Sequence, residues 1–218
     1  MARILLLHGL GGTGATMQPL ADGLIAAGHL THAPTLPGHG SQPEQLRDVG
    51  WVDWLAAAEA WPADVIVGQS MGGSLALALA ARGTCRAVVA INPPAPDPDA
   101  VDGLQWRRSR GHEWVDGPPL ADGEEGYTRL PIDALLQMAQ GSLLTVSTAV
   151  TVPLLLVTSA LDEVVDPFSA DAVAAGVTGP VTRLRLERSG HVATLSPERH
   201  LLVAAVIRFV ATPATPCH

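Results

Sequence analysis

The sequence predicts an α/β protein with a doubly wound, mostly parallel sheet of about six strands and helices on both faces. Two observations support this fold class. Short runs rich in Val, Ile and Leu alternate with stretches of helical composition along the chain. Several of these short runs have no polar face, as expected of strands that are covered on both sides in a parallel sheet.

The expected elements follow one another through most of the chain. Strands are expected at Arg3–Leu7, His29–Ala33, Asp64–Val67, Ala87–Ile91, Pro153–Thr158 and Val181–Leu186. Helices are expected at Ala15–Ala27, Trp51–Ala60, Ser70–Arg82, Ser169–Ala175 and Pro197–Phe209. Ser196 and Pro197 predict the start of the last helix, because serine is a favoured N-cap and proline a favoured first helical residue.

The segment from Pro93 to about Val150 breaks this alternation. Its clusters of proline and glycine predict loops without a strand, and residues 131–150 predict one or two helices. The segment follows one expected strand and ends before the next one. We therefore expect an insertion at about 93–150 within a single domain that spans residues 1–218, rather than a linker between two domains.

Composition and charge exclude several classes of protein. The 218 residues suffice for one sizeable core, and the net charge of −8 argues against nucleic acid and anionic membrane surfaces as partners. No apolar run is long enough to span a membrane, and Ile4–Leu7 is too short for a secretory signal. We therefore expect a cytoplasmic protein, or one whose targeting signal has been removed. Cys85 and Cys217 provide neither a disulfide framework nor the spacing of a metal site, so no metal is expected.

The stretch GQSMG, from Gly68 to Gly72, matches G-x-S-x-G between an expected strand and an expected helix. A sharp turn at this place brings neighbouring backbones close, so Gly68 and Gly72 tolerate no side chain. The Ser70 hydroxyl would be held above the carboxyl end of the sheet, at the positive end of the following helix. We expect Ser70 to be a nucleophile. The alternative is that Ser70 only caps the helix.

A serine hydroxyl needs a base to remove its proton and an acid to orient that base. In this type of site the chain order is serine, acid, histidine. Four histidines follow Ser70, and His191 is the one in a loop between the last expected strand and the last helix. Asp162 is the first carboxylate after the strand Pro153–Thr158, whereas Asp166 fits a helix N-cap better. We expect His191 to be the base and Asp162 to be the acid.

Two backbone N–H groups are needed to bind the negative oxygen that forms during acyl transfer. One is expected from Met71, directly after Ser70, and the other from Leu10, in the glycine-rich loop after the first strand. His8 in this loop is expected to be a structural residue. The loop also resembles a phosphate-binding turn, but its glycines do not fit G-x-G-x-x-G, so we expect no nucleotide cofactor.

Together these residues resemble the α/β-hydrolase superfamily, and more narrowly the small bacterial carboxylesterases and monoacylglycerol lipases. The stretches that carry the resemblance are LLLHGLGGTGATMQPLADGLIAAGHLTHAPTLPGHG, VGQSMGGSLALALA, LDEVVDP and SGHVATLS. They span most of the chain apart from the insertion, and they occur in the order that the family has.

The resemblance implies an α/β-hydrolase fold and a cofactor-free enzyme that hydrolyses small acyl esters of short to medium chain length. It implies that Ser70 is acylated, that His191 shuttles the proton and that Asp162 orients His191. It also implies that the insertion Pro93–Val150 is a lid over the site. Two alternatives stay open: a thioesterase or acyltransferase with the same three residues, and a non-catalytic ligand-binding protein on this fold.

Several other side chains are candidates for the substrate pocket or the core. Trp106 and Trp114 in the insertion could contact an acyl chain. His39 is expected to be structural. The apolar side chains expected either to wall an acyl pocket or to attach the insertion to the core are Leu135, Leu136, Met138, Leu143 and Leu144. The tryptophans expected in the core, on one helix face, are Trp51, Trp54 and Trp61.

Overall fold

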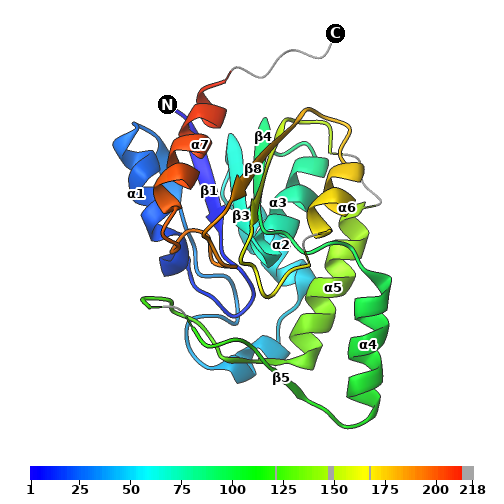
Figure 1. Cartoon of the computed structure of the whole chain (residues 1–218). Coiled ribbons are helices and arrows are strands. Elements are labelled where there is room, and N and C mark those ends of the chain that lie inside the picture. The colour runs from blue at the N-terminus through cyan, green and yellow to red at the C-terminus, as the bar shows by residue number, and fades with distance from the viewer. Residues whose placement is uncertain (121, 147–149, 167, 213–218) are drawn as a thin grey trace.

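A computed structural model describes residues 1–120, 122–146, 150–166 and 168–212 of the protein. Its centre is a six-stranded sheet with strand order β2-β1-β3-β4-β7-β8, in which all neighbouring strands are parallel (Figure 1). The strands are β1 Arg3–Leu7, β2 Leu30–His32, β3 Val65–Gln69, β4 Ala87–Ile91, β7 Leu154–Ser159 and β8 Val181–Leu186. The predicted fold class is confirmed.

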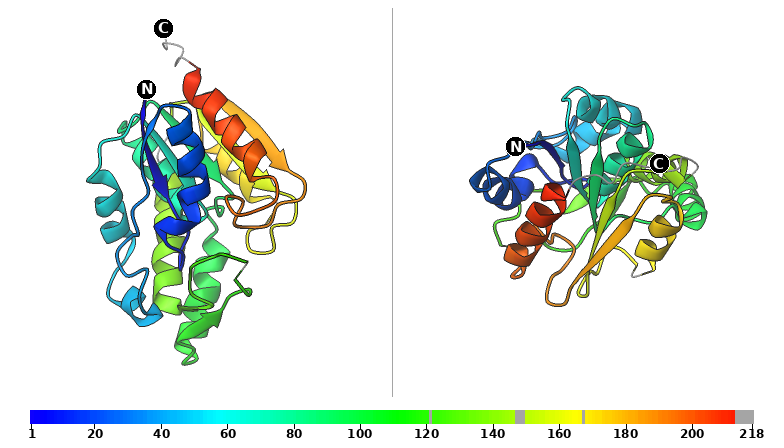
Figure 2. Two further views of the ribbon diagram at one scale, coloured as in Figure 1. Left: turned by 90° about the vertical axis from the view of Figure 1, so that its left-hand side faces the viewer. Right: turned by 90° about the horizontal axis from the view of Figure 1, so that it is seen from above.

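Helices cover both faces of this sheet. They are α1 Gln18–Ala26, α2 Trp51–Glu59, α3 Met71–Ala81, α6 Ser169–Ala175 and α7 Arg199–Ala211, and a short 3-10 helix, η1, at Gly14–Met17 precedes α1. Helices α1 and α7 lie on one face, and α2, α3 and α6 lie on the other (Figures 1 and 2). The two-sided cover explains why the central strand β3 is buried at every residue.

The side-chain alternation of β1 divides the hydrophobic core into two layers. Ile4 and Leu6 belong to the layer beneath α1 and α7, whereas Leu5 and Leu7 belong to the layer beneath α2 and α3. All four side chains are almost completely buried. Because helices cover both faces of the sheet, polar groups that need access to solvent or to a ligand can lie only at the edge where the strands end. The carboxyl ends of the parallel strands form this edge.

The segment between β4 and β7 forms two helices and a hairpin. Helix α4 covers Pro98–Ser109 and α5 covers Ile132–Val146, while β5 (Trp114–Asp116) pairs antiparallel with β6 (Arg129–Pro131). The prediction that this segment contains no strand is wrong, and so is the loop predicted where α4 lies.

Both errors have a physical reason. Helix α4 begins at Pro98 after Asp97, whose carboxylate accepts a hydrogen bond from the Asp99 amide at 2.9 Å, so an N-cap and a proline start were present in a proline-rich stretch. The two strands have only three residues each. They are held by tertiary contacts, since the guanidinium groups of Arg47 and Arg129 lie 4.8 and 4.0 Å from the ring centre of Trp114.

The predicted start of the last helix is also wrong. Helix α7 begins at Arg199, and its N-cap is Glu198 rather than Ser196. The hydroxyl of Ser196 donates to the carbonyl of Val192 at 3.1 Å. Residues 193–198 form turns and a bend that end the loop carrying His191, and the helix starts only after them.

No helix within the described ranges is long and apolar enough to cross a membrane.

Helices α2 and α5 touch where α5 has no side chain. A Cβ atom added to Gly141 would overlap the ring of Trp51, which is 6% exposed. By contrast, a Cβ atom added to Gly103 in α4 would meet no other atom within 4 Å. Gly141 is therefore needed for the close packing of α5 on α2, whereas Gly103 has space around it for a side chain.

We expect Gly141→Ala to lower the free energy of unfolding by about 1–3 kcal/mol, because the added methyl group forces the ring of Trp51 or helix α5 to move. Gly103→Ala is the matched control and should raise it by about 0.5–1 kcal/mol through the higher helix propensity of alanine. Urea unfolding at pH 7 measures both values. An equal effect of the two substitutions would contradict the close packing of α5 on α2.

Candidate active site

Ser70 occupies a sharp turn between β3 and α3. Its φ of 55° lies in the left-handed region, which residues other than glycine rarely adopt. A Cβ on Gly68 would overlap the carbonyl of Gly72, and a Cβ on Gly72 would overlap the carbonyl of Leu7. The Ser70 amide donates to the carbonyl of Ile91 at 2.8 Å, which fixes the turn to the end of β4. The Ser70 side chain makes no capping hydrogen bond to α3, which disfavours the alternative that it serves only as a helix cap.

His191 and Asp162 form a hydrogen-bonded pair although they come from different loops. The Nδ1 atom of His191 lies 3.0 and 2.9 Å from the two carboxylate oxygens of Asp162. Asp162 follows β7 and His191 follows β8, so parallel neighbouring strands bring them together at one edge. Their side chains are largely buried, at 7% exposed for Asp162 and 17% for His191.

The surroundings of Asp162 favour its ionised form. Burial raises the pKa of this carboxyl group, but hydrogen bonds from His191 and from the amides of Val164 (2.9 Å) and Val165 (3.0 Å) outweigh it and hold the pKa below its usual value. The ionised carboxylate of Asp162 accepts a hydrogen bond from the Nδ1–H group of His191. This leaves Nε2 as the ring nitrogen that can accept a proton.

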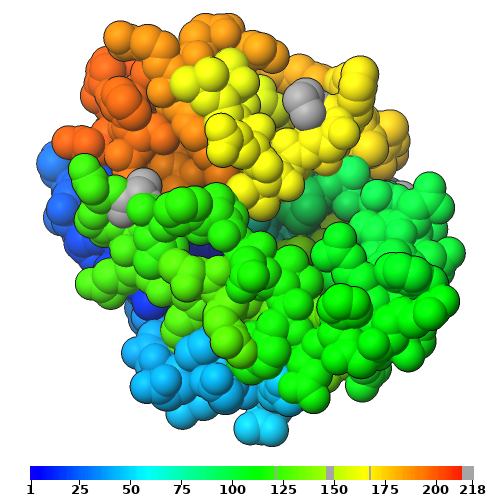
Figure 3. All heavy atoms as spheres, turned by 60° about the horizontal axis from the view of Figure 1, so that its bottom comes forward, coloured from blue at the N-terminus to red at the C-terminus, as the bar shows by residue number. Residues whose placement is uncertain are grey.

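Ser70 and His191 line the same cavity, which has a volume of about 670 Å³. The face of the molecule in Figure 3 is hollowed between the insertion, in green, and the segments after β7 and β8, in yellow to orange. Within the described residues the Ser70 hydroxyl has no hydrogen-bond partner. Hydrogen bonds between a nucleophile and its base are often long without substrate, so this geometry is compatible with a base role for His191.

The loop after β1 passes directly beside Ser70. A Cβ on Gly9 would lie 3.1 Å from the Cβ of Ser70 and 3.6 Å from its Oγ, so a side chain here would crowd Ser70. Leu10 lines the cavity, and Met71 starts helix α3. Among the described residues, no group accepts a hydrogen bond from the amide of Leu10 or of Met71. Both N–H groups are therefore unpaired within the described part of the chain.

His8 holds this loop in place and is completely buried. Its Nδ1 lies 2.8 Å from the carbonyl of Gly9, and its Nε2 accepts a hydrogen bond from the Leu36 amide at 3.0 Å. Desolvation by burial, together with the neighbouring His39, lowers the pKa of His8 to about 3. The ring is thus neutral and tied at both nitrogens, as a structural residue would be.

The insertion is bonded to the same loop. The Tyr127 amide donates to the carbonyl of Gly11 at 2.8 Å, and Gly12 forms a bridge with Gly126. The ring of Tyr127 is stacked parallel to that of His39. His39 is 8% exposed, and its Nε2 has no hydrogen-bond partner among the described residues.

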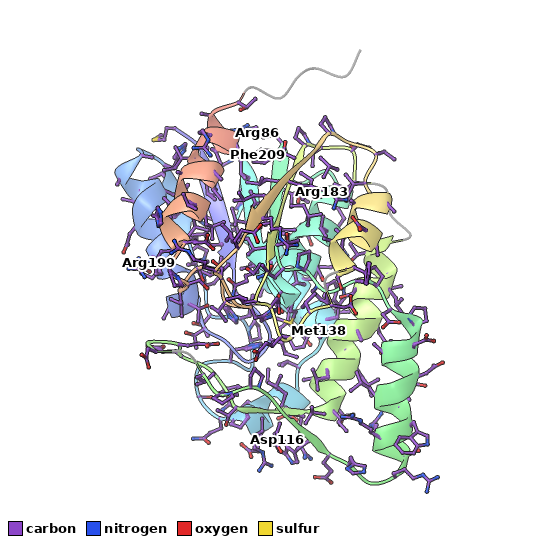
Figure 4. The ribbon with its side chains drawn as sticks, in the orientation of Figure 1. Arg86, Asp116, Met138, Arg183, Arg199 and Phe209 are labelled. Atoms are coloured by element: carbon purple, nitrogen blue, oxygen red, sulfur yellow. The ribbon has the colours of Figure 1, made fainter. Side chains whose placement is uncertain are left out.

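The cavity wall is only partly the one expected from the sequence. Leu135 and Met138 of α5 line it, and Figure 4 shows Met138 between the sheet and the hairpin that carries Asp116. Leu136 and Leu143 instead belong to a small apolar cluster that joins α4 to α5, and Leu144 is 66% exposed.

Neither tryptophan of the insertion lines the cavity. The ring of Trp106 is 58% exposed beside the guanidinium of Arg110. Trp114 contacts the guanidinium groups of Arg47 and Arg129. The structure therefore gives no support to a contact of either ring with an acyl chain.

The charges around the cavity are all negative. Three carboxylate residues, Asp122, Glu124 and Glu163, are among its lining residues, and no arginine is. Neither here nor elsewhere in the described part of the chain do three or more His, Cys, Asp or Glu side chains form a group that could hold a metal ion. The polar groups that face the cavity are thus suited to a substrate without strong negative charge.

Sequence reasoning missed two buried polar contacts of the His191 loop. The Asn92 side chain donates to the carbonyl of His191 at 2.8 Å, and the Thr194 hydroxyl lies 3.2 Å from Oε1 of Gln69. The signal for Asn92 was its place directly after the strand Ala87–Ile91, at the same edge as Ser70. Gln69 offered no such signal, because it reads as the residue between Gly68 and Ser70.

A sequence profile of the alpha/beta hydrolase family matches residues 4–205. The chain belongs to the alpha/beta hydrolase family. A thermostable monoacylglycerol lipase from Bacillus sp. (strain H-257) is 30% identical to this hydrolase over 231 aligned residues, which cover 97% of the chain and 91% of the lipase.

Solved structures agree with this assignment. A structure from work on LipS and LipT, two metagenome-derived lipolytic enzymes, has a TM-score of 0.85 and 28% identity, and the match covers 95% of the hydrolase and 92% of that chain. The monoacylglycerol lipase of Paleococcus ferrophilus has a TM-score of 0.73 at 16% identity, covering 95% and 93% of the two chains. The second likeness is one of fold alone.

The low pKa of His8 predicts a loss of stability in acid. His8 binds a proton in the unfolded chain below pH 6.5 but not in the folded one until about pH 3, so acidification favours unfolding between these values. His8→Gln should reduce the stability lost between pH 7 and pH 5 by about 2 kcal/mol. Urea unfolding at both pH values measures this difference. An unchanged difference would show that His8 is protonated in the folded protein.

The control for this experiment is Val89→Ala, a buried position of β4 without a titratable group. It should lower the stability at both pH values and leave the difference between pH 7 and pH 5 as it is in the unmodified protein.

Proposed function

We propose that this protein is a serine hydrolase that cleaves carboxylic esters of short to medium acyl chains, monoacylglycerols included, through an acyl-enzyme intermediate. One observation carries the proposal. Ser70 and His191 line one cavity, and His191 is hydrogen-bonded to Asp162. Leu10 lines the same cavity and Met71 follows Ser70, and the amides of both have no hydrogen-bond partner among the described residues. This is the set of groups that acyl transfer to a serine requires.

The proposed reaction begins at the Ser70 hydroxyl. Oγ attacks the ester carbonyl carbon while Nε2 of His191 takes its proton, and the amides of Leu10 and Met71 bind the negative oxygen of the tetrahedral intermediate. Asp162 stabilises the imidazolium through Nδ1. Collapse of the intermediate breaks the bond to the alcohol oxygen, which receives the proton from His191. Water then repeats both steps, releasing the acid and restoring Ser70.

The cavity supports a neutral substrate with an apolar acyl chain. Its wall includes apolar side chains from both the insertion and the hydrolase core, namely Leu10, Leu130, Leu135, Met138, Leu161, Val164, Val192 and Leu195. Its carboxylates, without an arginine among the lining residues, disfavour an acyl carrier with phosphate groups, such as coenzyme A. The names of the relatives, monoacylglycerol lipase and lipolytic enzyme, agree with an uncharged glycerol ester.

The insertion is proposed to act as the lid of this site. Residues from three of its parts, the stretch Gly117–Leu120, the hairpin residue Leu130 and helix α5, line the cavity that contains Ser70. Access of an ester to Ser70 is therefore bounded by the insertion on one side and by the loops of Asp162 and His191 on the other.

The first test combines covalent labelling with turnover. A fluorophosphonate probe should label Ser70, and p-nitrophenyl esters of graded chain length should be hydrolysed, while Ser70→Ala should abolish labelling and lower kcat by at least about 10⁴-fold. Ser74→Ala, one turn further along α3, is the matched control and should keep both. Labelling that persists in Ser70→Ala, or no turnover of any ester or thioester, would refute the proposal.

Asp162→Asn should lower kcat by about 10⁴-fold, the size of this change in serine proteases, because the amide no longer fixes the Nδ1–H tautomer of His191. Steady-state kinetics on the best p-nitrophenyl ester measures the effect. Asp166→Asn is the control, since its carboxylate accepts from the Phe168 amide at 2.8 Å and is not bonded to His191. A loss below tenfold in Asp162→Asn would mean that another group orients the base.

The thioesterase and acyltransferase alternatives predict different products. A thioesterase should turn over acyl-coenzyme A faster than a monoacylglycerol of the same chain length. An acyltransferase should transfer the acyl group to an added alcohol in preference to water. Either result would replace ester hydrolysis while keeping the proposed roles of Ser70, Asp162 and His191.

A further inference from the structure

Asn92 is the only asparagine of the 218 residues, and it lies directly after β4. It is 3% exposed, and its φ is 45°. Apart from glycines, only Ser70 and Asn92 have a positive φ in the described part of the chain. Asparagine enters this region more easily than most residues, so the position suits its backbone preference. Backbone strain beside a site is often kept for function.

The side chain of Asn92 joins two loops of the site. Its Nδ2 donates to the carbonyl of His191 at 2.8 Å and to the hydroxyl of Ser159 at 2.9 Å, and the carbonyl of Gly190 is 3.5 Å away. The backbone carbonyls of His191 and Gly190 can only accept. The amide nitrogen, not the oxygen, must therefore face them.

The backbone around Asn92 continues these connections. Its amide donates to the carbonyl of Val157 at 2.8 Å, and the preceding carbonyl, of Ile91, accepts from the Ser70 amide at 2.8 Å. Asn92 contacts the hydroxyl of Ser159, and the backbone carbonyl of Ser159 accepts a hydrogen bond from the Asp162 amide at 3.3 Å. Ile91 is thus hydrogen-bonded to Ser70. The next residue, Asn92, is hydrogen-bonded to the end of β7, which precedes Asp162, and to the loop of His191.

We infer that Asn92 is a positioning residue, which fixes the backbone of His191 so that its ring stays aligned with Ser70 and Asp162. Asn92 is not among the residues that line the cavity, so it acts through His191 rather than on the substrate. The Nδ1 atom of His191 is hydrogen-bonded to Asp162. The backbone carbonyl of His191 accepts hydrogen bonds from the Asn92 side chain and from the Ala193 amide, the latter at 3.1 Å. This inference rests on the proposed function.

The size of the effect follows from the geometry of proton transfer. A displacement of about 1 Å in a reacting group costs about 10²-fold in rate. Losing the Asn92 donor leaves a buried carbonyl with one hydrogen bond fewer, which allows the His191 loop to move. The substrate contacts themselves are not altered, so the loss should fall on kcat rather than on KM.

The first variant is Asn92→Gly, which keeps the positive φ and removes the amide group. We expect kcat for a p-nitrophenyl ester to fall 10- to 100-fold with KM changed by less than threefold, and fluorophosphonate labelling of Ser70 to slow by a similar factor. Val89→Ala, in the buried interior of the same strand, is the control for lost stability. It should lower Tm and keep kcat within threefold.

A second readout separates positioning from a merely structural role. In a His191→Ala background there is no imidazole to misplace, so Asn92→Gly should change the residual kcat by less than twofold. Should Asn92→Gly fail to fold, Asn92→Asp provides the second variant. It matches the shape and conformational preference of asparagine but replaces the donor by a carboxylate oxygen, and it should lose at least as much kcat.

Three outcomes would overturn the inference. The first is a kcat within threefold of the unmodified protein in Asn92→Gly or Asn92→Asp. The second is that Asn92→Gly lowers kcat by the same factor in the unmodified protein and in the His191→Ala background. The third is that Val89→Ala, at an equal loss of Tm, lowers kcat by the same factor as Asn92→Gly. Failure of the proposed function would be distinct, because the unmodified protein would then neither turn over esters nor be labelled at Ser70, and both proposals would fall together.

Discussion

The site depends on the absence of side chains around Ser70. Three stretches of backbone meet there: the end of β1 with its loop, the turn itself and the first turn of α3. They fit because Gly68 and Gly72 have no Cβ atom that would overlap the neighbouring backbone, and because Gly9 also leaves room beside the Cβ of Ser70. The backbone of Ser70 is held in the left-handed region, with its amide bonded to β4, and its side chain consequently points away from the packed core into the cavity.

The parallel sheet supplies the other groups at the same edge. Asn92, Asp162 and His191 follow β4, β7 and β8, as Ser70 follows β3. The two faces of the sheet are filled with apolar side chains, so the strand ends are the place where polar groups can meet without a cost to the core. Those groups that are buried are largely bonded to one another, which turns the edge into a rigid polar layer.

The fold was predictable because its strands are apolar on both faces and its helices alternate with them. The exact strand ends were not, since hydrogen bonds with neighbouring strands decide them. Strands β5 and β6 could not be found in the sequence, because three-residue strands depend on contacts such as that of Arg47 with Trp114, which are far apart in the chain. The start of α7 was misplaced because a local serine signal was overridden by the turn before Glu198.

The candidate site was predictable to the extent that it lies at strand ends. The order of Ser70, Asp162 and His191 along the chain, each just past a strand, was enough to expect them together. In the structure Ser70 and His191 line one cavity, and Asp162 is hydrogen-bonded to His191. Their chemical roles remain predictions. The contact of Asn92 with the His191 carbonyl could not be predicted, because it depends on the path of a loop 99 residues later in the chain.

The bond between the Tyr127 amide and the Gly11 carbonyl has a mechanical consequence. The segment proposed as the lid and the loop that contains Leu10 share one small antiparallel contact at this place. An outward movement of that segment would either break the contact or displace the Leu10 amide. If the proposed roles of Ser70 and Leu10 hold, opening the cavity and displacing one of the two N–H donors would be a single movement, so an open molecule would react more slowly with acyl groups than a closed one.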